Sequence, residues 1–179
     1  MRTALCVWMA LTVGITGSVT GRTQPASIDP WTPLKAWLGT WEGTSKGQPG
    51  NGTVKREYRF ILRDHFIEVR NVSTYAPQPQ NPKGEVHEDV GYISYDRNRN
   101  MYVFRQFHVE GFVNTYVGVP AGNGDVVFTS ESIENIPPGW RARETYRRMN
   151  DDERIELFEL AEPGEEFITY SETRLKRTR

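Results

Sequence analysis

The stretch that decides the fold is Pro33-Leu34-Lys35-Ala36-Trp37-Leu38-Gly39-Thr40-Trp41-Glu42-Gly43. Thr32 is a candidate N-cap and Pro33 a candidate first helical residue, and Leu34, Trp37 and Leu38 follow at the spacing of one helical face. Gly39 should end this turn, and a strand that carries Trp41 begins directly after it. One helical turn is not stable alone, so its large apolar side chains must pack on other parts of the chain. We expect Trp37 and Trp41 to plug one end of a β-barrel.

From Thr40 onward, apolar and polar residues alternate, and short runs rich in Gly, Pro, Asn and Asp interrupt the alternation. The segment 76–84 contains three prolines and is therefore expected to be the longest loop. A first strand begins at Thr40, and the later strands are expected at residues 54–62, 66–75, 85–95, 101–109, 112–119, 125–133, 140–149, 153–161 and 166–175.

About ten strands joined by short turns leave no room for crossover helices, so consecutive antiparallel pairing is expected. A meander of this size removes its exposed edges by closing on itself. The sequence therefore predicts an all-β, antiparallel up-and-down β-barrel over residues 32–177, preceded by an extended lead-in at residues 22–31. A two-sheet sandwich is the competing architecture.

The N-terminal segment has the layout of a secretory signal peptide, with Arg2 followed by a mostly apolar run to Val19. We expect cleavage near residue 21 and a secreted or periplasmic protein, and an uncleaved N-terminal anchor is the alternative. The single cysteine, Cys6, lies inside this segment, so the remaining chain has no thiol for disulfides or metal binding. Its nearly balanced charge gives no basic field for nucleic acid or anionic lipid. We expect a monomer or a homodimer with no nucleic-acid or membrane partner.

Gly39-Thr40-Trp41 resembles the Gly-x-Trp signature of the lipocalin and fatty-acid-binding (calycin) group. Its extension to Ser45 looks like the Gly-x-Trp-x-Gly-x-Gly run of nitrobindin-like heme-binding β-barrels, with Ser45 in place of the last glycine. Three further motifs are similar to a bacterial lipocalin-like family of unknown function: Gly91-Tyr92-Ile93-Ser94-Tyr95-Asp96, Arg141-Ala142-Arg143, and Gly164-Glu165-Glu166-Phe167 with Glu172-Thr173-Arg174.

The resemblance implies a barrel whose central cavity binds a small apolar or amphipathic ligand. In nitrobindin-like barrels this ligand is heme, held by a histidine near the C-terminal strands. Here the histidines are His65, His87 and His108, and none follows residue 108. A heme bound in that way would lack its histidine, and Tyr170 or His108 would have to replace it.

Alternation along the expected strands indicates which side chains point inward. An apolar, aromatic lining with a few polar groups is typical of a small-molecule pocket, although the same aromatic residues could simply fill the barrel. Inward charged groups are unfavourable unless they are paired or meet water, and the arginines could instead lie on the surface. The candidate ligand-binding residues are Trp41, Arg56, Tyr58, Phe60, Phe104, His108, Tyr116, Glu144 and Tyr146.

Catalytic motifs are absent, including the Gly-x-Ser-x-Gly elbow. In His87-Glu88-Asp89, only His87 and Asp89 share a strand face, and one pair cannot complete a metal site. We therefore name no catalytic residue, metal ligand or firm cofactor. The main hypothesis is an exported barrel that binds a small lipophilic ligand without catalysis. The alternatives are a nitrobindin-like barrel that handles heme or nitric oxide, and an isomerase- or cyclase-type enzyme with Tyr, Arg and Glu as acid-base groups.

Overall fold

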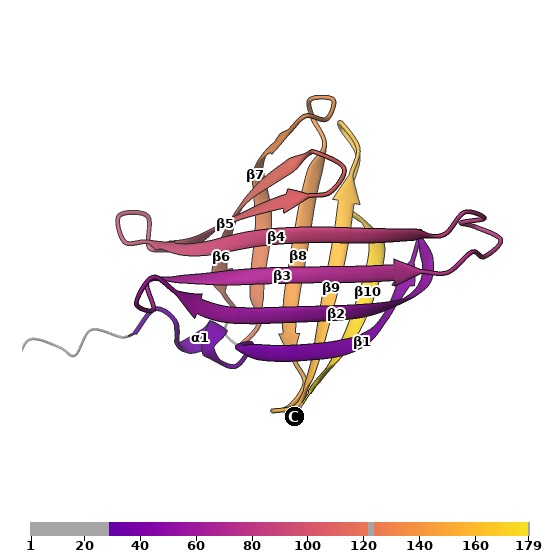
Figure 1. The fold of residues 1–179 in the computed structure, drawn as a ribbon. Coiled ribbons are helices and arrows are strands. Elements are labelled where there is room, and N and C mark those ends of the chain that lie inside the picture. The colour runs from indigo at the N-terminus through magenta and orange to yellow at the C-terminus, as the bar shows by residue number, and fades with distance from the viewer. Residues whose placement is uncertain (1–28, 122–123, 179) are drawn as a thin grey trace, which may run out of the picture.

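The computed structural model describes residues 29–121 and 124–178 as one closed β-barrel of ten strands (Figure 1). The expected signal peptide and most of the lead-in lie outside these residues. No helix in the described part of the chain is long and apolar enough to cross a membrane. The elements are α1 (Thr32–Lys35), β1 (Gly39–Gly47), β2 (Gly50–Ile61), β3 (Phe66–Tyr75), β4 (Glu85–Asp96), β5 (Met101–His108), β6 (Val113–Pro120), β7 (Val126–Glu134), β8 (Arg141–Arg148), β9 (Glu153–Ala161) and β10 (Ile168–Arg177).

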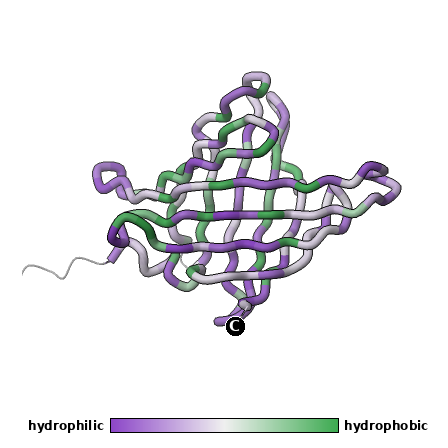
Figure 2. Tube along the Cα trace, in the orientation of Figure 1, coloured by the Kyte–Doolittle hydropathy of each residue, from purple (hydrophilic) through white to green (hydrophobic). Residues whose placement is uncertain are grey.

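Each strand pairs antiparallel with its neighbour in sequence, and β1 pairs with β10 to close the barrel, with Trp41 opposite Arg177 and Gly47 opposite Ser171. The predicted up-and-down barrel is confirmed, and the sandwich is excluded. In Figure 1, β1 to β4 form the front wall and cross steeply over the strands of the back wall. Figure 2 shows the alternation of apolar and polar residues along these strands.

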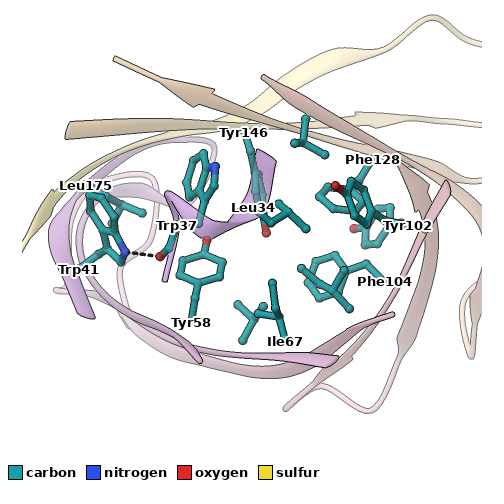
Figure 3. Close-up of a cluster of buried hydrophobic side chains, with 14 of the residues drawn as sticks. Leu34, Trp37, Trp41, Tyr58, Ile67, Tyr102, Phe104, Phe128, Tyr146 and Leu175 are labelled. Carbon is teal, nitrogen blue, oxygen red and sulfur yellow. Dashed lines mark hydrogen bonds between the residues drawn. The ribbon is translucent and has the colours of Figure 1, made fainter. Parts of the chain in front are cut away.

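The helical turn closes one end of the barrel, as the sequence predicts. Gly39 has a φ of +112°, a backbone conformation that residues other than glycine rarely adopt. This conformation lets the chain turn from α1 into β1. The indole nitrogen of Trp41 then donates a hydrogen bond to the backbone oxygen of Trp37 at 2.7 Å (Figure 3). The prediction was wrong at one point: Thr32 is the first helical residue, and Trp31 precedes it. Trp31 is itself buried in the core, so the lead-in contributes to the plug.

Two arginines from the last strands hold the plug in place. Arg154 donates to the backbone oxygen of Ala36 at 2.8 Å, and its guanidinium lies 4.8 Å from the ring centre of Trp41. Arg177 donates to the backbone oxygens of Ala36 and Leu38 at 2.9 and 2.6 Å and lies 4.2 Å from the same ring. These contacts satisfy carbonyl groups at the end of α1 and add cation–π attraction.

On β3 the inner face is buried, and Glu68 is a buried residue on the otherwise largely exposed outer face. Ile67 and Val69 point into the core, while Glu68, on the outer face, is covered by Arg59 and Arg70 at 2.6 and 3.1 Å. The two arginines on the outer wall therefore shield this carboxylate from water.

Candidate functional site

The aromatic residues predicted to line a cavity instead pack against one another in the plug half of the barrel. Tyr146 lies 5.3 Å from Phe128 and 6.2 Å from Tyr58, measured between ring centres, and Phe104 lies 5.4 Å from Phe128. Figure 3 shows this cluster around the plug. Trp41 belongs to the cluster, and Phe60 packs on its edge against Trp31 at 5.7 Å. These five candidates form the core of the plug half, which is the filled-barrel alternative.

The middle of the barrel is polar. Arg56 on β2 forms an ion pair with Glu156 on β9, and both side chains are nearly inaccessible to solvent. The Arg56 Nε atom also donates to the Oδ1 atom of Asn71 at 3.2 Å. The expectation that the arginines could lie on the surface is therefore wrong for Arg56. The reason is a partner one hundred residues away in sequence, which local alternation cannot indicate.

Glu144 and Tyr116 lie in the same polar layer and were both predicted to face inward. Burial, together with the neighbouring charge of Glu156, raises the pKa of Glu144 to about 8. The Oε2 atom of Glu144 has no hydrogen-bond partner among the described residues. The hydroxyl of Tyr116 accepts a hydrogen bond from the Nδ2 atom of Asn114 at 2.7 Å. The layer is therefore a packed network in which Glu144 is held in its neutral, protonated form near pH 7.

Three groups with metal-ligand chemistry meet near the open end of the barrel: His87, Asp89 and His108. The Nε2 atom of His87 lies 3.4 Å from the Oδ2 atom of Asp89 and 3.4 Å from the Nδ1 atom of His108. His108 also stacks on Phe112, with 4.0 Å between ring centres. His108 was thus rightly predicted to face inward, but its neighbours were missed.

The strand register explains this meeting. Asp96 and Met101 pair at the turn between β4 and β5, and following the pairs away from that turn puts Asp89 opposite His108. The tight turn was recognised from the sequence, so this register could have revealed the third residue. Sequence reasoning stopped at the two residues that share β4.

The local environment separates the pKa values of the two histidines. The hydrogen bond with Asp89 raises the pKa of His87 to about 9 against the effect of burial, and Glu110 adds to the rise. Burial lowers the pKa of His108 to about 4. Burial alone would raise the pKa of Asp89, but its hydrogen bond with His87 and the charge of Arg56 bring that pKa below its ordinary value. Near pH 7, His108 is therefore neutral and Asp89 is ionised.

A separate hollow of ≈ 350 Å³ lies where β8, β9 and β10 reach the open end. Tyr170 lies at an irregularity in the pairing of β10 with β9 and packs against Phe158, with 5.6 Å between ring centres. A depression of ≈ 410 Å³ lies near the plug end and includes Glu42, Arg154 and Lys176, none of which was a predicted site residue. The residues that line the hollow at the open end are Gln48, Trp140, Leu160, Glu162, Glu165, Glu166, Ile168 and Tyr170.

One family model and one solved structure agree with this architecture. Residues 31–177 match the family described as THAP4-like, heme-binding β-barrel domain. The crystal structure of Rv2717c from M. tuberculosis superposes with a TM-score of 0.63 at 17% sequence identity, over 84% of this chain and 98% of that chain. A protein of unknown function from the DUF3598 family of Nostoc punctiforme has a TM-score of 0.29 at 8% identity, over 84% and 99% of the two chains. No curated protein matches the sequence.

Proposed function

Because the chain belongs to the THAP4-like heme-binding β-barrel family, we propose that it binds a small, largely apolar ligand at the open end of its barrel, and that this ligand is heme. The observation that carries the proposal is the hollow of ≈ 350 Å³ that contains Trp140, Leu160, Ile168 and Tyr170. Its volume lies in the range of small-molecule pockets, about 300–1,000 Å³. The plug half of the barrel is filled by its own aromatic side chains.

A heme bound at the open end would need an iron ligand other than a histidine of β10. Strand β10 carries no histidine, but Tyr170 lies on it and faces the hollow. The nitrogens of His108 are turned towards His87 and Asn114, at 3.4 and 3.2 Å, so that this ring is already engaged. Burial raises the pKa of Tyr170, and its phenol is therefore neutral until a cation binds. A ferric iron favours the phenolate, and tyrosine is a known heme ligand.

In this arrangement Tyr170 holds the iron, and Trp140, Leu160 and Ile168 supply the apolar wall against the porphyrin. When bound, heme supplies an iron centre that takes small ligands such as oxygen or nitric oxide. The protein residues bind the group, orient it and exclude water from one side of it.

Charges around the hollow are mixed and bear on which ligands it accepts. Glu162, Glu165 and Glu166 lie on its rim, and they would repel an anionic ligand. Arg141 donates to the backbone oxygen of Glu165 at 2.5 Å and stacks on Phe167, so one cation stands beside the rim. Arg141 does not line the hollow, and the glutamates therefore dominate the charge that a ligand meets there.

Titration with hemin, followed by absorbance in the Soret region, tests this function. We expect one hemin per chain, and we expect Tyr170→Phe to weaken binding by at least tenfold. His65→Ala is the control, because His65 lies in the turn between β2 and β3 at the plug end. Absence of a Soret change with the wild-type protein would contradict the proposal, as would equal binding by the Tyr170→Phe variant.

A lipophilic ligand other than heme is the second possibility that the same hollow supports, because its wall carries a tryptophan, a leucine and an isoleucine. Native mass spectrometry of the protein purified from its own host distinguishes the two. The heme proposal predicts the mass of heme in the complex. A lipid-like mass that hemin cannot displace would favour the second possibility.

A further inference from the structure

We propose that His87, Asp89 and His108 form a binding site for one divalent transition-metal ion, with zinc as the preferred ion, just inside the open end of the barrel. Two imidazole nitrogens and one carboxylate oxygen are offered, and all three atoms lie within 4.8 Å of one another. Two histidines and a carboxylate are a common ligand set for zinc and for non-heme iron. The site is separate from the function proposed above, because none of the three residues lines the hollow around Tyr170.

The distances suit a metal ion of this size. Zinc binds imidazole nitrogen and carboxylate oxygen at about 2.0–2.2 Å, so two ligands of one tetrahedral ion lie about 3.3 Å apart. The His87 Nε2 atom is 3.4 Å from the Asp89 Oδ2 atom and 3.4 Å from the His108 Nδ1 atom. Two of the three pairs of ligand atoms are therefore already spaced for a shared ion, and the atoms of the third pair lie within 4.8 Å of each other. Three protein ligands leave a position for water or another small ligand.

A second layer of residues orients each ligand, as in established metal sites. The Nδ1 atom of His87 lies 2.8 Å from the Oε1 atom of Glu110, which directs Nε2 towards the other two groups. Asp89 accepts hydrogen bonds from Asn71 at 2.8 Å and from Gln106 at 3.0 Å. The Nε2 atom of His108 faces the side-chain amide of Asn114 at 3.2 Å.

Asn114 adds a separate observation. It is almost fully buried, yet its Oδ1 atom has no hydrogen-bond partner among the described residues. Oxygen and nitrogen of a side-chain amide exchange places when the group turns over. After that turn, the oxygen accepts the hydrogen of His108 Nε2, and the Nδ1 lone pair of His108 is then free to bind the ion. The amide thus has an unused acceptor that a metal-bound His108 requires.

Charge in the barrel interior also favours a cation here. Among the described side chains inside the barrel and away from the plug, the buried carboxyl groups are those of Asp89, Glu144 and Glu156, and the buried arginine is Arg56. Glu68 and Glu159 are paired with arginines on the outer wall. Arg56 is engaged by Glu156. Asp89 is 4% exposed, and its one ion-pair partner among the described residues is His87. A divalent ion held by both residues would bring further positive charge to this buried carboxylate.

Isothermal titration with Zn²⁺, on tag-free protein stripped with a chelator, tests the site. We expect one Zn²⁺ per chain, and we expect His87→Ala, Asp89→Asn and His108→Ala each to weaken binding by about 100-fold or more. His65→Ala is the matched control and should bind Zn²⁺ as the wild-type protein does. Titration with Co²⁺ should give the visible absorption of a four-coordinate ion.

Some of these ligands are buried, so their variants could fail to fold. Glu110→Gln is therefore a second test, because it changes no ligand and no buried residue. Glu110 is about half exposed, at 49%, and contacts His87, so it would act on a bound ion only through that ligand. We expect this variant to keep the wild-type melting temperature and to lose about 10–100-fold in zinc affinity. No zinc binding by the wild-type protein would overturn the proposal, as would unchanged affinity in a folded ligand variant. Hemin titration of Glu110→Gln should match the wild-type protein, which separates this site from the hollow.

Discussion

Asp89 and His108 face each other across β4 and β5, and the carboxylate of Asp89 accepts hydrogen bonds from Asn71 and Gln106. The other half of the barrel is closed by the hydrogen bond from Trp41 to Trp37 and by the aromatic cluster around it. The molecule therefore divides along the barrel axis. The plug half stabilises the fold, and the half at the open end carries the groups that can bind ligands.

Trp41→Ala should lower the free energy of unfolding by about 3–5 kcal/mol, as for other buried large-to-small aromatic changes. The side chain has no solvent exposure, and it fixes both α1 and the guanidinium of Arg154. Urea unfolding followed by circular dichroism measures the loss. Trp140→Ala, at the open end, is the control and should lose less. A loss below about 1 kcal/mol for Trp41→Ala would mean that this residue does not close the barrel.

Glu156→Gln should destabilise the protein by about 3–5 kcal/mol, because it leaves the buried guanidinium of Arg56 without a counter-charge. Replacing both residues, as in Arg56→Met with Glu156→Leu, should recover much of this loss. The matched control is Glu134→Gln, whose partner Arg105 is half exposed, and about 1 kcal/mol or less is expected there. Equal losses in the two single variants would show that burial of the Arg56 pair has no special effect.

Glu144 should make stability depend on pH. Its pKa is about 8 in the folded protein and near its ordinary value of 4.5 in the unfolded chain. The folded state therefore binds one more proton between these values, and unfolding becomes easier as pH rises from about 4.5 to 8. Glu144→Gln removes this contribution. The free energy of unfolding of the variant minus that of the wild-type protein should thus be larger at pH 8 than at pH 5, as measured by urea unfolding. The same stability difference at both pH values would contradict the assignment.

The glutamates on the rim of the hollow should make the affinity for a porphyrin depend on the charge of its carboxylates. Glu165 and Glu166 repel carboxylates, so hemin dimethyl ester should bind at least as tightly as hemin. Replacing both glutamates by glutamine should strengthen hemin binding and leave the ester nearly unchanged. Competition titrations measure both affinities. Much tighter binding of hemin than of its ester, lost in Arg141→Ala, would mean that Arg141 dominates the rim.

Most of the fold follows from local sequence patterns. Alternation places nearly all strands within a few residues of their observed bounds, since each strand must present one apolar face to the core. Trp31 was missed because it precedes the helical signal, and its burial depends on Phe60 and Tyr102 across the barrel.

Prediction of the site is limited by contacts between distant segments. The partner of Arg56 lies on β9, and no local pattern indicates which carboxylate will reach it. The meeting of Asp89 with His108 is different, because a short turn sets the register between their strands. The hollow near Tyr170 lies beside an irregularity in the pairing of β10 with β9, and a single sequence does not indicate that irregularity.

Electron paramagnetic resonance of the ferric hemin complex tests the central claim most directly, because it identifies the side chain that binds the iron. The proposal predicts the high-spin signal of an iron with a phenolate ligand, and loss of that signal in Tyr170→Phe but not in His108→Ala. A signal typical of histidine ligation, retained in Tyr170→Phe and lost in His108→Ala, would contradict it.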